Sequence, residues 1–193
     1  MRPTRRVDFP QSVPPDHGKL RPSLGLVIVD LSPERAVLLG QLAGVRQHVL
    51  TQLDGLSDEQ LRQPVLPSGW SCLGLVRHLT LSDERYWFEV VVAGEPLDFW
   101  PEGDNGDWRV EPGEAAAEVI EAYRSAIARS DEIIATRQLE DPPRQPEDWW
   151  REAEVDFPDL RAIVVHVLVE TAVHAGHLDA VRELLDGRQH LVL

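Results

Sequence analysis

The chain has 193 residues, 42% of them apolar and 27% charged, which indicates one folded domain with a tail and excludes a disordered or fibrous chain. Its formal net charge of −14 argues against binding nucleic acid or an anionic membrane, because both partners are themselves negative. Since no segment approaches the roughly 18 apolar residues of a membrane span or forms a secretory signal, we expect a cytoplasmic protein. The single cysteine, Cys72, excludes an intrachain disulfide and fits that reducing compartment.

Residues 1–30 are predicted to form an irregular N-terminal arm, and residues 31–193 a helical domain. The arm contains Pro3, Pro10, Pro14, Pro15 and Pro22, and proline blocks helices and central strands. Within the arm, residues 25–30 are predicted to form a short edge strand.

Four long helices are predicted from apolar residues that recur every three or four positions. The first runs from Pro33, after the cap residue Ser32, to the break at Asp54-Gly55. A helical turn at 57–62 follows, and the other long helices are expected at about 71–93, 112–137 and 158–185. This pattern predicts an all-α four-helix bundle with two long connections, over 97–111 and 139–157, of the kind that often line sites.

Titratable groups of the last predicted helix lie on its apolar side. At about 100° per residue, with Glu170 at zero, His166 falls at about −40°, His177 at about −20° and His174 at about +40°. The aliphatic residues of the same stripe include Ile163, Val167 and Val181. The ordinary charges lie on a second arc, expected to face solvent or a partner in a homodimer: Arg161, Asp179, Arg182, Glu183 and Asp186.

The apolar stripe predicts either a metal site or a buried ion pair. Glu170 and His174 are four residues apart, so their side chains project together, as metal-binding pairs do in helical bundles. His78, in the middle of the second helix, is the best third ligand. Three protein ligands leave an open position for water or substrate, which is the catalytic pattern. The alternative is a Glu170–His174 ion pair without metal.

The remaining candidates carry two interpretations each. His166 and His177 are candidate general bases, or else orient a metal ligand or pack. His48 is expected in the core or at the surface. Cys72, at a helix start, is either reactive or, more in keeping with its type, buried and inert. Tryptophans of the two long connections either wall a pocket or pack the loops: Trp100, Trp108, Trp149 and Trp150.

Three stretches of the chain resemble the DinB/YfiT-like superfamily of four-helix metalloproteins, in particular its actinobacterial branch with the mini-circle proteins. They are Gly69-Trp70-Ser71 leading to Arg77-His78-Leu79, the segment 170–179 followed by Arg182-Glu183, and the turn 56–61. The similarity covers about residues 33–187. It implies a metal held by His78 on the second helix and by Glu170 and His174 on the last, with glutamate first as in the mycothiol-dependent maleylpyruvate isomerase type.

The resemblance also implies the chemistry. Characterised members use low-molecular-weight thiols such as mycothiol or bacillithiol in S-transfer or isomerisation. We therefore expect a metal-dependent thiol S-transferase, or a related isomerase or hydrolase, that acts on a small electrophile. Zinc suits one carboxylate and two imidazoles best, and nickel or iron would also fit. The alternative is a non-enzymatic, metal-stabilised bundle that binds a small molecule or a partner.

Overall fold

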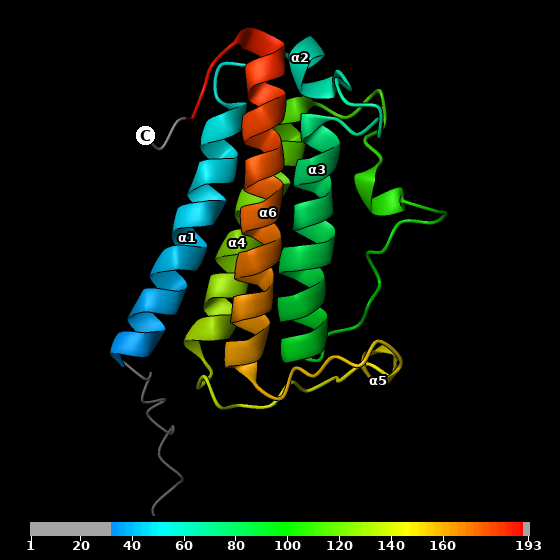
Figure 1. Ribbon diagram of the computed structural model, residues 1–193. Helices are drawn as coiled ribbons and strands as arrows, with labels where there is room; N and C mark the ends of the chain where they lie inside the picture. Colours follow the sequence, from blue (N-terminus) through cyan, green and yellow to red (C-terminus); the bar gives the residue numbers. More distant parts are fainter. Residues whose placement is uncertain (1–31, 191–193) are drawn as a thin grey trace, which may run out of the picture.

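The computed structural model describes residues 32–190, whose helices form an all-α bundle (Figure 1). Its long helices are α1 (Pro33–Leu53), α3 (Cys72–His78) continued by η1 (Leu79–Val92), α4 (Ala116–Ala135) and α6 (Leu160–Asp186). Short helices in the connections are α2 (Asp58–Arg62), η2 (Gly106–Trp108) and α5 (Trp149–Glu152). The all-α prediction is confirmed. The predicted arm over 1–30 and its edge strand lie outside the described residues.

Side-chain caps begin three of the long helices. The backbone N–H of Arg35 donates to Ser32 Oγ at 3.1 Å, that of Gly74 to Ser71 Oγ at 3.1 Å, and that of Ala162 to Asp159 Oδ1 at 2.9 Å. Helix α6 ends at Gly187, whose φ of +77° favours glycine. These local signals explain why the predicted helix positions match the structure closely.

Helix α4 begins later than predicted. It starts at Ala116 rather than near Pro112. The Glu114 carboxylate accepts a hydrogen bond from the backbone N–H of Glu111 at 2.7 Å, and the carbonyl of Glu114 accepts one from Arg62. The segment before Ala116 is therefore held as a turn by contacts that an apolar pattern does not reveal.

The second long helix changes its winding after His78. Through η1 the backbone bonds in the wider i→i+5 pattern of a π-helix, which continues past its end as Ala93 N–H donates to Phe88 O at 3.0 Å. The sequence predicted the extent of this helix but not its winding. The change follows directly after His78 and places Ser82 Oγ 3.2 Å from Nδ1 of His78.

Ion pairs and hydrogen bonds at both ends define the direction of the helices. Arg161 of α6 pairs with Glu34 at the start of α1 (2.6 Å), and Arg182 donates to Gln52 O at the end of α1 (2.7 Å), so α1 and α6 run parallel. At the start of α1, Arg35 donates to Ile134 O (2.6 Å) near the end of α4, so α4 runs antiparallel to α1. The connection 93–115 therefore crosses the whole length of the bundle, past α3 and η1 (Figure 1).

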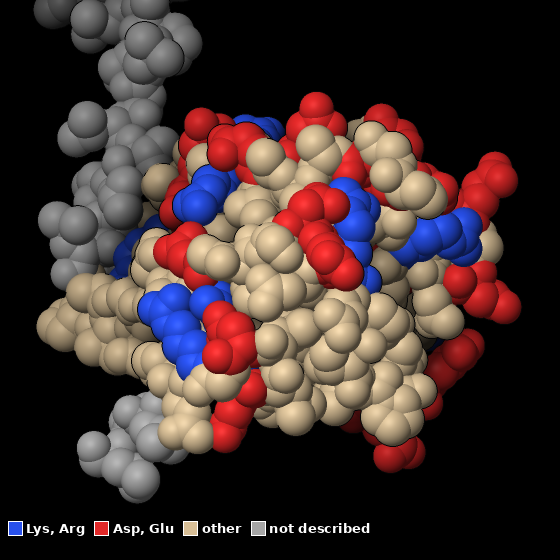
Figure 2. All heavy atoms as spheres, turned by 90° about the horizontal axis from the view of Figure 1, so that it is seen from above, with Lys and Arg blue, Asp and Glu red and all other residues tan. Residues whose placement is uncertain are grey.

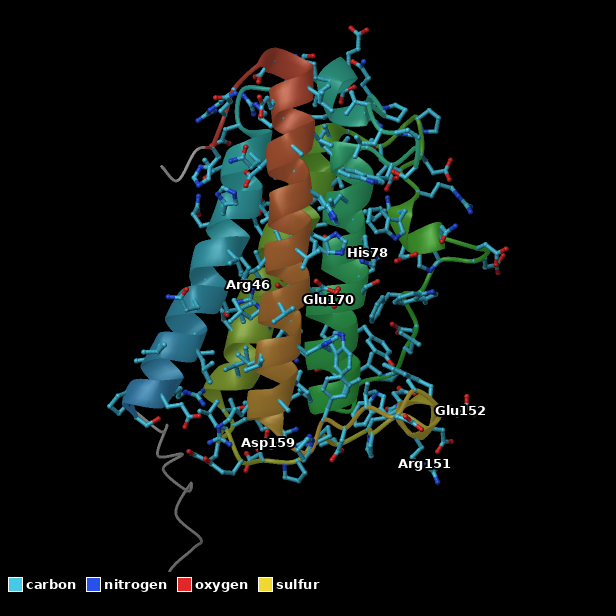
Figure 3. The ribbon with its side chains drawn as sticks, viewed as in Figure 1. Arg46, His78, Arg151, Glu152, Asp159 and Glu170 are labelled. Atoms are coloured by element: carbon cyan, nitrogen blue, oxygen red, sulfur yellow. The ribbon has the colours of Figure 1, made fainter. Side chains whose placement is uncertain are left out.

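A polar layer divides the core. One apolar cluster surrounds Leu73, Leu75 and Tyr123, and the other surrounds Trp87, Phe88 and Ile163. Between them the guanidinium of Arg46 makes a bidentate pair with Glu84, at 2.7 and 2.6 Å, and contacts Asp131 at 2.9 Å. Arg46 is 3% exposed and Glu84 fully buried. This layer ties α1, η1 and α4 together at mid-height, the level of the predicted site (Figure 3).

The prediction that the charged arc of α6 faces solvent or a partner is wrong in part. Arg182, expected on a solvent or dimer face, is 3% exposed because its guanidinium donates to the carbonyls of Gln52 and Asp54 at the end of α1. On the same arc, Asp179 pairs with His48 at 2.7 Å, which gives His48 a partner between two helices. This part of the arc therefore joins α6 to α1.

Candidate functional site

His78 is held by two polar neighbours. Its Nδ1 lies 2.6 Å from Oδ2 of Asp107, and Ser82 Oγ donates to the same carboxylate oxygen at 3.0 Å. Asp107 belongs to η2 in the long connection and is 9% exposed. Because a carboxylate accepts, Nδ1 of His78 carries the proton and Nε2 is left with its lone pair.

His174 stands beside His78. The two ring centroids are 5.0 Å apart, while Trp108 stacks on His78 at 4.2 Å and meets His174 at 5.7 Å. Nδ1 of His174 is buried and has no hydrogen-bond partner within residues 32–190. Burial, with further effects from His78 and His177, lowers the pKa of His174 to about 4. His174 is therefore a neutral imidazole at neutral pH.

A cavity of about 450 Å³ opens beside His78. Glu170 lines it and lies at the same height of the bundle as His78 (Figure 3). Glu170 is half-buried rather than fully buried as predicted, and makes no hydrogen bond or ion pair with the described residues. Asp83 also lines the cavity, with one unpartnered oxygen; burial and the charges of Glu84 and Glu170 raise the pKa of Asp83 well above its usual range.

The two predicted general bases occupy different surroundings. His166 lines the cavity and packs against Trp87 at 4.6 Å and Phe157 at 4.9 Å, and burial lowers its pKa. His177 is exposed; its ring lies 5.6 Å from His174 and 6.2 Å from Trp70. Only His166 therefore contacts the cavity.

His78 lies beside His174 and shares a cavity with Glu170, but these three predicted ligands do not form a ready metal site. Among residues 32–190, no three His, Cys, Asp or Glu side chains are arranged as a ready metal group. The donor set nevertheless suits a divalent ion, because His174 presents a buried nitrogen without a partner, the carboxylate of Asp107 orients the ring of His78, and Glu170 is unpaired within residues 32–190. Side-chain rotation is what would bring His78, Glu170 and His174 around one ion.

A polar cleft of about 710 Å³ is lined by residues from the segments 62–71 and 104–112. Trp108 lines it as well as stacking on His78, so this side chain links the cleft to the histidines. Trp70 lines the cleft too, 6.4 Å from Trp108. The polar residues of its lining include Arg62, Ser68, Ser71, Asp104, Asn105 and Arg109.

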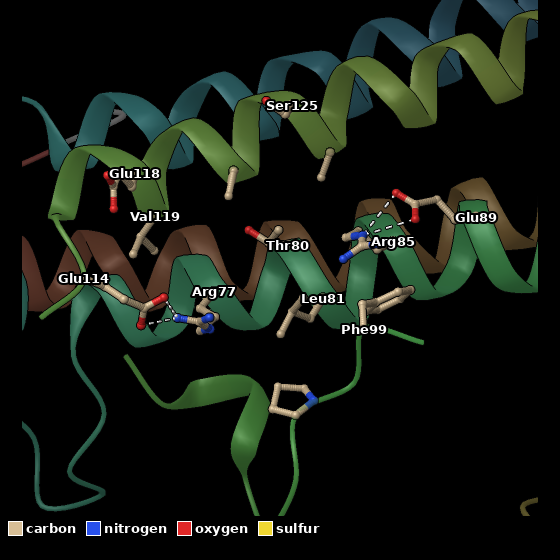
Figure 4. A pocket seen from close by; sticks show the side chains of 13 residues that line it. Arg77, Thr80, Leu81, Arg85, Glu89, Phe99, Glu114, Glu118, Val119 and Ser125 are labelled. Carbon is tan, nitrogen blue, oxygen red and sulfur yellow. Dashed lines mark hydrogen bonds and ion pairs between the residues drawn. The ribbon is translucent and has the colours of Figure 1, made fainter. Parts of the chain in front are cut away.

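A third cavity, of about 470 Å³, lies between α4 and η1 (Figure 4). Its two arginines are already paired, Arg77 with Glu114 at 2.6 Å and Arg85 with Glu89 at 3.1 Å. Arg85 also covers the ring of Phe99 at 3.7 Å. These pairs neutralise both arginines, so the described lining of this cavity offers no unpaired arginine to attract an anion.

The tryptophans divide between the two predicted roles. Trp100 and Trp149 line the cavity beside His78, and Trp108 lines the polar cleft. Trp150 packs in the apolar cluster around Trp87, and its ring stacks on that of Trp87 at 6.0 Å. Cys72 is 1% exposed, so the prediction that it is buried is confirmed, and burial raises the pKa of its thiol to about 11, which favours the inert interpretation.

Asp107 is the site residue that sequence reasoning missed. It lies in a connection without periodicity, and its one available signal was its position next to Trp108 in a long loop. Asn105, in the left-handed region with a φ of +54°, begins the tight turn that brings Asp107 to His78.

The end of the bundle in Figure 2 shows acidic and basic side chains interspersed rather than a basic patch. No helix within residues 32–190 is long and apolar enough to cross a membrane.

Comparison with known proteins identifies the family. A family model described as mycothiol-S-transferase matches residues 37–187, a range that contains His78, Asp107, Glu170 and His174. No curated protein and no solved structure matches the chain. The family supports a mycothiol-related, S-transferase-like function, and it agrees with the superfamily resemblance found in the sequence. The chain belongs to the mycothiol-S-transferase family.

Proposed function

We propose that the chain conjugates mycothiol, through its sulfur, to a small electrophile beside His78 and His174. The observation that carries this proposal is the unpartnered, buried Nδ1 of a neutral His174 next to the Asp107-oriented His78. A buried imidazole nitrogen without a partner, such as Nδ1 of His174, is costly unless it is used, since buried polar groups are normally paired. The placement of the two imidazoles supports binding a metal or a thiol rather than packing alone.

His78, Glu170 and His174 are the residues that would hold a divalent metal, with zinc the best fit and nickel or iron as alternatives. When bound, such an ion stabilises a thiolate near neutral pH. Metal ligation requires neutral imidazoles, which is the state that burial gives His174. Asp107 holds His78 with Nε2 unprotonated, the form that can ligate.

The proton of the thiol needs an acceptor. His166 lines the cavity, and the burial that lowers its pKa keeps it neutral, so we assign it the general base. His177, outside the cavity, is the second candidate and would exchange protons with solvent. In the reaction the S–H proton goes to the base, a bond forms between sulfur and the electrophilic carbon, and the leaving group departs with its electron pair.

The polar cleft is suited to the thiol substrate. Mycothiol carries its cysteine on a glucosamine–inositol unit, and such polyols bind to aromatic faces and to planar polar side chains. Trp70 and Trp108 supply the faces, and Arg109 and Asn105 are among the polar groups. Because Trp108 also stacks on His78, a polyol in this cleft would direct its thiol toward the histidines.

Metal content and turnover test this proposal separately. We expect His78→Ala, Glu170→Ala and His174→Ala each to lose most of the zinc that the wild type retains after dialysis, measured by elemental analysis. His48→Ala is the matched control, since His48 pairs with Asp179 away from the site. Zinc retained by the double variant E170A/H174A would overturn the ligand assignment. Zinc bound normally, with no conjugation of mycothiol to any electrophile, would favour the non-enzymatic binding module.

A further inference from the structure

Two large aromatic side chains stand partly exposed at the mouth of the cavity beside His78. Trp100 is 43% exposed and Trp149 is 41% exposed, although tryptophan is buried on average. Trp100 comes from the connection before η2, and Trp149 begins α5 in the connection after α4. Two segments far apart in sequence thus bring apolar surface to one opening, which marks a binding site rather than loop packing.

Tyr86 of η1 organises this aromatic wall. Its hydroxyl accepts a hydrogen bond from Nε1 of Trp149 at 3.2 Å, and its ring meets that of Trp100 edge-on at 6.1 Å. Trp87 closes the inner side, 5.5 Å from Tyr86. Tyr86, on the helix η1, therefore orients Trp149 and contacts Trp100, although both tryptophans come from the long connections.

The same cavity offers no positive side chain. Its described lining contains neither lysine nor arginine, and its charged members are the acids Asp83 and Glu170. Arg77 and Arg85, the sequence neighbours of His78 and Tyr86, line the other cavity instead, where they pair with Glu114 and Glu89 (Figure 4). A carboxylate on an aromatic ring held between Trp100 and Trp149 would therefore lose its hydration without gaining an arginine or lysine of the described lining as its partner.

We propose that this aromatic cavity binds the electrophile and selects a flat, uncharged aromatic ring, held by Trp100 and Trp149. The inference rests on the proposed S-transfer and names the substrate class of that site. Ring–ring contacts at 4.5–7 Å stabilise such a complex beyond simple burial. Tyr86 acts as a positioning residue, because it fixes Trp149 through the hydroxyl.

Three electrophiles separate the contributions. 1-Chloro-2,4-dinitrobenzene has the favoured ring, 4-chloro-3,5-dinitrobenzoate has a similar ring with a carboxylate, and chloroacetamide has no ring. In each, mycothiol sulfur bonds to the carbon that bears chlorine, chloride leaves and the thiol proton goes to the base. We expect kcat/KM of wild type, corrected for the uncatalysed rate, to be about tenfold lower for the benzoate than for the uncharged ring.

Variants assign the selectivity to the wall. W100A/W149A should lose about tenfold in kcat/KM for 1-chloro-2,4-dinitrobenzene, mainly through KM, and less than about twofold for chloroacetamide. Tyr86→Phe should show a smaller loss of the same kind. Leu184→Ala, 62% exposed and outside all three cavities, is the matched control and should change neither. Equal losses for both electrophiles in W100A/W149A, or none, would overturn the inference.

A binding measurement keeps this inference distinct from the proposed function. 2,4-Dinitroaniline has the same ring but no leaving group, and its binding is measured by calorimetry. Binding to wild type that W100A/W149A weakens about tenfold supports the aromatic site even if no electrophile is conjugated, in which case the S-transfer proposal alone fails. Conjugation of all three electrophiles with no binding of dinitroaniline overturns the aromatic site and leaves S-transfer standing.

Discussion

Oδ2 of Asp107 lies 2.6 Å from Nδ1 of His78, although the two residues are 29 positions apart and Asp107 belongs to the short helix η2 of a long connection. The contact selects the tautomer of neutral His78 with its proton on Nδ1, which leaves the lone pair of Nε2 for the metal that we propose. It also anchors the connection 93–115 to the bundle at the site itself. The connection is therefore part of the proposed site and not merely a link between η1 and α4.

The first prediction concerns this contact. Asp107→Asn should lower zinc affinity or kcat/KM by about 10–100-fold, because an amide no longer enforces the Nδ1–H tautomer. Ser82→Ala, which leaves the carboxylate–imidazole contact intact, should cost much less. Zinc titration and steady-state kinetics measure both, and circular dichroism checks that the fold is kept. Equal effects of the two substitutions would show that the carboxylate has no special role.

The second prediction concerns the polar layer. Arg46→Met leaves Glu84 buried without its partner and should lower the free energy of unfolding by about 3–5 kcal/mol. Arg129→Ala removes exposed surface pairs with Glu95 and Glu132 and should cost far less. Replacing both buried partners, as in R46M/E84L, should recover part of the loss. The free energy of unfolding of each variant is measured with urea. Similar losses for R46M and R129A would contradict this prediction.

The third prediction concerns pH and the metal-free protein. The pKa of His174 is about 4 in the folded chain and about 6.5 when unfolded, so between these values the unfolded state binds more protons. The contribution of neutral His174 is present above pH 6.5 and is lost as pH falls toward 4. With a chelator present, wild type should therefore lose more stability over this range than His174→Gln. Parallel stability curves for the two proteins would be the contrary result.

The fourth prediction concerns Cys72. Because burial raises the pKa of its thiol to about 11, iodoacetamide at pH 8 should leave the native protein unlabelled and should label the urea-unfolded chain. Above the unfolded pKa of about 9, the thiol ionises only in the unfolded chain, so its contribution to stability declines from pH 9 to 11. Mass spectrometry measures the labelling, and rapid labelling of native protein would contradict burial.

Local signals made the helices predictable. The residues that cap a helix lie within a few positions of the end that they determine, as Ser32, Ser71 and Gly187 do. The late start of α4 escaped prediction because it depends on contacts of Glu114 with the distant residues Arg62 and Arg77. The π-winding of η1 escaped prediction because the apolar pattern indicates the extent of a helix and not its winding.

The site was predictable in part for the same reason. Helical periodicity placed His78 and His174 on inward faces, and the structure brings their rings to 5.0 Å. Asp107 and the wall formed by Trp100 and Trp149 come from connections, where spacing carries no information about position. Arg182 was misplaced because an arginine on a charged arc looks solvent-exposed until the carbonyls at the end of α1 are known.

The most direct test of the central claim is the conjugation of mycothiol itself. Zinc-reconstituted wild-type protein, mycothiol and 1-chloro-2,4-dinitrobenzene are incubated, and the thioether product is quantified by mass spectrometry against the uncatalysed reaction. Our account predicts product formation well above background with mycothiol, a weaker reaction with free cysteine, which lacks the polyol, and loss of the enhancement in His174→Ala. A rate equal to background for wild type, or an unchanged rate in His174→Ala, would contradict it.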